Sequence, residues 1–195
     1  GDQAVPVLQT LTTDASKESN RYGDTDSFTV TATFNDYMQV GTSIIVTLNS
    51  DRTLELKAPE NADDNPTKTM TGVYTVGEEG TETATPLEIT AINVNTATDI
   101  YGNALAAIST EAIPVLGGNV INIDTAPPTS TITGASYSSG VITLTGTHFT
   151  VAELGVGLNG SVKDLIDWSK LTWDINGDNG TTGGADNDFR AFTAD

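Results

Sequence analysis

The segment 174–180, with the sequence DINGDNG, has the residue types and spacing that best suit metal chemistry in this chain. Asp174, Asn176 and Asp178 carry oxygen-bearing side chains at alternate positions. When the backbone between them curls, such side chains converge on one hard cation, and calcium takes about 6–8 oxygen ligands at roughly 2.3–2.6 Å. Neighbouring carbonyl groups would add further ligands. The spacing therefore predicts a calcium-binding loop.

This segment departs from a full EF-hand loop at two positions. The glycine expected at the sixth position is Asn179, and the glutamate expected at the twelfth is Ala185. Asp186 and Asp188 follow closely, and we expect Asp186 to complete the calcium shell. The alternative is a solvated turn, because Asn, Asp and Gly dominate turns for backbone reasons alone.

A second group of oxygen side chains, Asp99, Asn103 and Asp124, is expected to meet at one end of a β-sandwich. Asp99 and Asn103 belong to one loop, and Asp124 begins a proline-containing connecting segment. A calcium ion held by all three would join distant segments and fix the angle between two modules. Without a cation, close carboxylates would repel one another. The alternative is an exposed turn beside an ordinary aspartate in a connecting segment.

The two tryptophans of the chain, Trp168 and Trp173, suggest a different chemistry. With Tyr101 or Tyr137 they would form a platform on which sugar rings stack, as in a carbohydrate-binding module. The competing interpretation is that both indoles anchor the core of a small module.

Catalytic chemistry finds little support in the sequence. His148 is the single histidine, and the chain has no G-x-S-x-G, H-E-x-x-H or phosphate-binding glycine motif. Glycoside hydrolysis requires two opposed carboxylates in a cleft lined by aromatic residues, and the chain has only two tryptophans. We therefore do not expect an enzyme.

Charge and composition exclude further classes of partner. The formal net charge is -18, from 26 acidic residues against 8 Lys and Arg. No cationic surface is available to neutralise phosphates, so nucleic acids and anionic membranes are not expected partners. No run of apolar residues is long enough to span a bilayer. Cysteine is absent, so disulfides cannot stabilise a small module, and metal binding is one substitute.

Strand patterns dominate the chain. Threonine is the commonest residue, and residues 27–34 alternate strictly, which places Phe28, Val30, Ala32 and Phe34 on one face. Similar patterns recur at 44–48, 53–57, 70–76, 87–94 and 120–123, separated by segments rich in Gly, Asn, Asp and Pro. The sequence predicts an all-β protein with an Ig-like β-sandwich over residues 1–128. A second, smaller or incomplete β-rich module is predicted over 129–195, beginning with a hairpin around residues 138–140.

Several short motifs follow one another in the order found in a known family. Residues 22–30 (YGDTDSFTV) look like a strand opening, and residues 98–103 (TDIYGN) are similar to a D-x-x-G-N loop. Residues 124–128 (DTAPP) look like a D-T-x-x-P connecting segment, and residues 140–149 (GVITLTGTHF) resemble an L-T-G-x-x-F strand. Through these motifs the first 150 residues resemble the bacterial Ig-like repeats of large secreted surface proteins and adhesins. The chain departs from the pattern at residues 2–6, where Val5 replaces the earlier proline of the connecting segment.

The resemblance implies an extracellular, repetitive protein whose junctions are stiffened by calcium and whose partners are neighbouring modules. We expect a non-catalytic structural or adhesive module, secreted and located at a bacterial cell surface. Two alternatives stay open. One is the carbohydrate-binding module, and the other is a subunit of a surface layer or filament in which the second module is completed by a strand from another chain.

Overall fold

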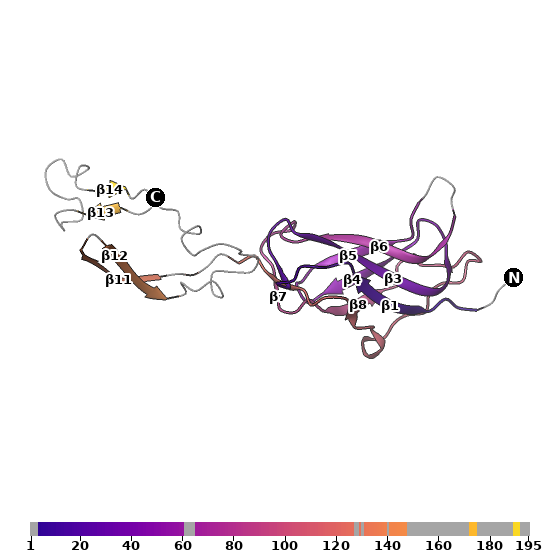
Figure 1. Ribbon diagram of the computed structural model, residues 1–195. Coiled ribbons are helices and arrows are strands. Elements are labelled where there is room, and N and C mark those ends of the chain that lie inside the picture. Colours follow the sequence, from indigo (N-terminus) through magenta and orange to yellow (C-terminus); the bar gives the residue numbers. More distant parts are fainter. Residues whose placement is uncertain are drawn as a thin grey trace. The chain divides into compact units, whose positions relative to one another are not determined.

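The computed structural model describes residues 4–60, 65–126, 129, 131–139 and 141–147, and the backbone of two short strands at 172–174 and 189–191 (Figure 1). The described residues fall into two compact units, the first ending at residue 126 and the second beginning at Thr129. Independent folding of 1–128 and 129–195 as separate domains stays a prediction. The part of the chain that the structure describes contains strands, one 3-10 turn at Thr110–Ala112, and no α-helix. No helical segment described is long and apolar enough to cross a membrane.

The first unit is built on a seven-stranded sheet that curls around its own core (Figure 1). In spatial order the strands are β8 (Ile89–Asn93), β4 (Ser43–Leu48), β5 (Thr53–Lys57), β6 (Thr67–Thr75), β3 (Ser27–Met38), β1 (Leu8–Thr13) and β9 (Leu116–Gly117). Neighbouring strands pair antiparallel except β1 and β9, which run parallel. A second, three-stranded sheet contains β2 (Arg21–Tyr22), β10 (Asn122–Asp124) and β7 (Thr83–Ala84). The predicted all-β sandwich is confirmed.

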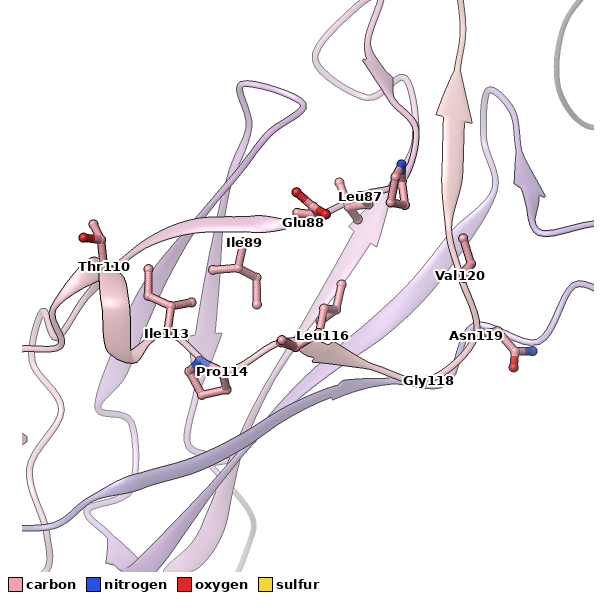
Figure 2. Close-up of a pocket in the computed structure, with 12 residues that line it drawn as sticks. Leu87, Glu88, Ile89, Thr110, Ile113, Pro114, Leu116, Gly118, Asn119 and Val120 are labelled. Atoms are coloured by element: carbon pink, nitrogen blue, oxygen red, sulfur yellow. The ribbon is translucent and has the colours of Figure 1, made fainter.

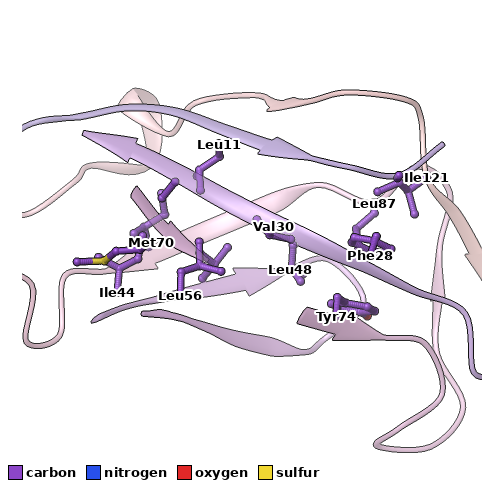
Figure 3. Packing of buried hydrophobic residues seen from close by; sticks show 14 of the residues in the cluster. Leu11, Phe28, Val30, Ile44, Leu48, Leu56, Met70, Tyr74, Leu87 and Ile121 are labelled. Atoms are coloured by element: carbon purple, nitrogen blue, oxygen red, sulfur yellow. The ribbon is translucent and has the colours of Figure 1, made fainter. Parts of the chain in front are cut away.

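The core follows from the alternation of the longest strand. Along β3, Phe28, Val30, Ala32 and Phe34 all lie buried, as predicted from the period of two. Strands β4, β5 and β6 of the same sheet contribute buried Ile44, Val46, Leu48, Leu56, Met70 and Tyr74. Figure 3 shows Ile44 and Met70 toward one end of this core and Phe28 with Tyr74 toward the other. The rings of Phe28 and Tyr74 stack with their centroids 5.1 Å apart. Burial of these apolar faces contributes most to holding the sheet in its curl.

The second unit begins with the predicted hairpin. β11 (Thr131–Ser138) pairs antiparallel with β12 (Val141–Thr147). Ser139 in the turn has a positive φ of 53°, as tight hairpin turns require. Further along, β13 (Thr172–Asp174) pairs antiparallel with β14 (Phe189–Ala191). These strands agree with a second, smaller β-rich module.

Candidate functional site

Asp99 closes the loop that the sequence analysis singled out. Its side chain is fully buried, and its Oδ1 accepts hydrogen bonds from the backbone N–H groups of Tyr101 and Asn103, both at 2.8 Å. Its Oδ2 accepts a third from the Asn103 Nδ2, also at 2.8 Å. The backbone turns back at Gly102, which has a φ of +88°. Asp99 and Asn103 therefore do meet, as hydrogen-bond partners within one turn.

The electrostatics of this loop favour a charged aspartate. Burial raises the pKa of Asp99, but the hydrogen bonds from Asn103, Tyr101 and Gly102 together outweigh it and hold the pKa below its usual value. The same bonds decide whether the residue suits a calcium ion. Three protein donors already occupy the two carboxylate oxygens, and the residue has no exposed surface through which a hydrated cation would reach it. In this arrangement Asp99 does not fit a calcium site.

Asp124 lies far from this loop, at the opposite end of the sandwich. Asp99 forms a β-bridge with Met38, the last residue of β3. Asp124 belongs to β10, which pairs with β2 at Tyr22, just before β3 begins. The 12 residues of β3 separate the two ends, which corresponds to roughly 35 Å at the rise of a strand. The predicted meeting of Asp99, Asn103 and Asp124 at one cation is therefore wrong.

We call the end of the first unit at which residues 124–126 leave it the exit end. A buried polar network lies there, built around Arg52 and Glu82, which are 6% and 5% exposed. The Glu82 Oε2 accepts a hydrogen bond from the Tyr74 hydroxyl at 2.7 Å and faces the Arg52 Nη1 at 3.5 Å. The Glu82 Oε1 accepts a further bond from the Gly77 N–H at 2.8 Å. Both carboxylate oxygens of Glu82 are thus satisfied by protein groups.

Arg52 is held in place from several sides. Its Nη1 donates to the Thr75 carbonyl at 2.6 Å, and its guanidinium lies over the Tyr74 ring, 4.3 Å from the centroid. Glu78 and Glu79 approach its other nitrogens at 3.5 Å from the surface, with side chains about 60% exposed. One buried cation thus gathers three carboxylates at this end of the module. Arg52 therefore neutralises a group of glutamates, Glu78, Glu79 and Glu82, that the sequence analysis did not single out.

The hydroxyl of Tyr74 completes the network. It lies 2.8 Å from the Ser50 Oγ as well as 2.7 Å from Glu82. Burial raises the pKa of Tyr74 to about 12, and the neighbouring charge of Glu82 adds to that rise, while the Ser50 hydrogen bond and Arg52 oppose it. Tyr74 therefore stays a neutral donor at any physiological pH.

Glu82 also fastens the exit segment, residues 124–126, to the module. The Thr125 N–H donates to the Glu82 carbonyl at 3.0 Å, and the Glu82 N–H donates to the Thr125 Oγ1 at 2.8 Å. Asp124 adds local order, because its Oδ1 accepts from the Ala126 N–H at 3.0 Å. In this structure Asp124 therefore stabilises the turn of the exit segment. Sequence reasoning missed Arg52 and Glu82, since nothing in their spacing links them to residue 125.

A groove of about 350 Å³ lies between the two edge strands of the large sheet, β8 and β9. Figure 2 shows Ile89, Ile113 and Leu116 gathered in this space, with Glu88 beside them. Among the described residues that line the groove, Glu88 is the only ionisable one. A single carboxylate cannot supply the opposed pair that glycoside hydrolysis requires. The described lining of the groove carries no catalytic constellation.

The remaining predicted site residues lie outside the described side chains. Trp173 and Asp174 belong to β13, of which the structure describes the backbone, with Trp173 opposite Arg190 and Asp174 opposite Phe189. Trp168, Asn176, Asp178, Asp186 and His148 lie outside the described residues. Their predicted roles, in calcium binding for the acidic loop and in sugar binding for the tryptophans, stay predictions. Within the described ranges, no group of three or more His, Cys, Asp or Glu side chains is arranged to hold a metal ion.

No protein-family model matches the chain, and no curated protein and no solved structure resembles it at a significant level. The resemblance to bacterial Ig-like repeats therefore rests on the sequence motifs.

Proposed function

We propose that this chain is a non-catalytic structural spacer of a bacterial cell-surface protein, in which β-rich modules follow one another along the chain. The observation that carries the proposal is the placement of the two connecting segments. Val7, in the segment before β1, is held near the end of β3 by Asn35. The Asn35 N–H donates to the Val7 carbonyl at 3.1 Å, and the Val7 N–H donates to the Asn35 Oδ1 at 2.7 Å. Residues 124–126 leave from the opposite, exit end. A module threaded in this way extends a tandem chain by its full length.

The fastening of the exit segment supports the same role. β10 pairs with β2 on one side and β7 on the other, and Thr125 is bonded to Glu82 in both directions. The last residues of the module are therefore part of its folded body as far as residue 125. A load or a constraint applied to the connecting segment reaches the sandwich directly, as a spacer requires.

In this proposal, only the acidic loop of the second module binds calcium. Asp99 and Asn103 are bonded to each other, and Asp124 lies at the other end of the module. The acidic loop with Asp174, Asn176, Asp178 and Asp186 keeps the oxygen spacing that calcium prefers. We therefore assign the expected calcium to the second module, where it would stabilise a small domain that has no disulfide.

Two measurements test the spacer function. Chains that carry residues 1–195 in two and four tandem copies are imaged by electron microscopy, and the contour length is expected to grow in proportion to the number of copies. Antibodies against the first module are expected to label intact bacteria that produce the protein. A tandem chain that collapses into one globule, or an epitope reached only in permeabilised cells, would contradict the proposal.

A further inference from the structure

The first and last strands of the first module run parallel to each other. β1 pairs with β9 through Leu11 opposite Leu116 and Thr12 opposite Gly117. β2 pairs with β10 in the same sense, with Arg21 opposite Asn122 and Tyr22 opposite Ile123. The Asn122 N–H also donates to the Asn20 carbonyl at 2.8 Å. The segment that begins the module is thus laid along the segment that ends it, at two separate places.

The direction of these strands decides how the module meets a pulling force. The segment before β1 leaves at the end where β3 finishes, and the segment after β10 leaves at the exit end. A force that draws these two segments apart slides β1 and β2 along β9 and β10. The interstrand hydrogen bonds lie across this direction, so they share the load and must break together. Two strands that leave a pairing at the same end would instead lose their bonds one at a time.

We propose that the parallel pairings β1–β9 and β2–β10 form a mechanical clamp that resists extension of the module along its long axis. The clamp rests on the proposed spacer function, because a spacer at a surface is stretched between its two neighbours. The antiparallel partner β3 reinforces it, since its bonds to β1 are also loaded in shear. At the exit end, the bonds between Thr125 and Glu82 secure the strand that carries the force.

Close approach of the backbones at β9 gives the clamp a point that can be altered. Gly118 has a φ of +112°, and a Cβ added there would lie 2.9 Å from both the carbonyl oxygen and the Oγ1 of Thr13. A side chain at position 118 must therefore push the end of β9 away from β1. Gly80 offers a matched control, because its φ is +115° and a Cβ there meets nothing within 4 Å. Both glycines have a positive φ of similar size, and only the substitution at position 118 meets atoms of the clamp.

Single-molecule force spectroscopy on the full chain tests the clamp through the direction of pulling. The chain has no cysteine, so pairs of introduced cysteines define the anchor points. V5C with A126C pulls along the proposed shear direction. V5C with V115C pulls both strands from the same end of the β1–β9 pairing. All three positions are exposed.

We expect the shear pair to unfold at a force at least about twofold higher than the unzipping pair, because forced unfolding reports the barrier that the loaded bonds impose. The rupture should release about 40 nm of chain in the shear geometry. G118A should lower the shear force by more than the unzipping force, because all bonds of the pairing share the shear load whereas unzipping begins at Leu116, the end of β9 away from Gly118. G80A should alter neither force. Equal forces in the two directions would overturn the clamp, and the wild-type comparison decides this even if G118A fails to fold.

The clamp and the spacer function fail separately. A directional force difference in a protein that is absent from the cell surface would keep the clamp and refute the surface role. A surface-exposed tandem chain with no directional difference would keep the spacer and refute the clamp.

Discussion

Replacement of Glu82 by alanine tests whether the buried network at the exit end holds the first module together. The substitution removes the acceptor of the Tyr74 and Gly77 hydrogen bonds and leaves Arg52, which is 6% exposed, without its buried partner. Removal of one member of a buried ion pair costs about 3–5 kcal/mol, because the other charge stays buried and uncompensated. Glu78 and Glu79 still face Arg52, but these exposed pairs are screened and contribute less than about 1 kcal/mol each.

We therefore expect E82A to lower the free energy of unfolding of the first module by about 3 kcal/mol, and its melting temperature by about 10 °C. E79A is the matched control, because it removes an exposed carboxylate at the same 3.5 Å from the same guanidinium. Its expected cost is below about 1 kcal/mol. E82Q should fall between the two, since the amide oxygen preserves one acceptor and the volume of the side chain.

The two modules can be followed separately in the full chain. Trp168 and Trp173 both belong to residues 129–195, so tryptophan fluorescence reports the second module. Calorimetry together with hydrogen exchange of peptides from 4–126 reports the first. The expected result is a lowered transition for the first module and an unchanged tryptophan transition.

The origin of the effect is tested by a second substitution. If the cost of E82A comes from an unpaired buried cation, R52M in the E82A background should recover part of the lost stability. Equal effects of E82A and E79A, both below about 1 kcal/mol, would refute the reasoning. So would a double variant that is destabilised by the sum of the two single changes.

Three further outcomes follow from the same structure. Because the pKa of Tyr74 is raised to about 12, the contribution of its neutral hydroxyl to stability is complete below about pH 10. This contribution is lost between pH 10 and 12, by roughly 2 kcal/mol. Urea midpoints at pH 9 and 11.5 should show the loss in the wild type and not in Y74F. Because the pKa of Asp99 is lowered, its contribution to the stability of the first module is present above the usual aspartate pKa and is lost as the pH falls through the lowered value. D99N should therefore weaken the acid dependence of the urea midpoint. An unchanged dependence would contradict the loop-closing role of Asp99. Calcium at a hundredfold excess over its dissociation constant should stabilise the second module, as reported by tryptophan fluorescence, by about 2.7 kcal/mol. D178A should abolish this gain. A calcium response of the first module instead would refute the assignment.

Local patterns in the sequence were sufficient to predict β3, β4, β5, β6, β8 and β10 of the first module, whereas β1, β2, β7 and β9 were not predicted. The alternation of Phe28, Val30, Ala32 and Phe34 places one face of β3 in the core, and the structure buries all four side chains. The hairpin around Ser139 follows from turn residues between two β-branched runs, and β11 and β12 pair there. Both features depend on neighbours a few positions away, which is the range over which side-chain period and turn chemistry act.

The pairing of Asp99 with Asn103 was within the same short range, and the two do meet. What the sequence did not reveal is that the loop satisfies its own carboxylate. From the sequence alone, neighbouring oxygen side chains are equally consistent with a bound cation and with hydrogen bonds from backbone N–H groups. Only the turn at Gly102 shows that backbone N–H donors reach Asp99.

The sequence by itself determined the β-class, the buried faces and the acidic character of this chain, because these depend on residue type and local period. The tertiary structure decided which distant residues meet. Arg52 reaches Glu82 across 30 positions and Glu82 reaches Thr125 across 43, while Asp124 is carried to the opposite end from Asp99. These outcomes follow from the curl of the sheet and the parallel docking of its last strand on its first, which are set by the packing of the whole core and have no counterpart in any short segment.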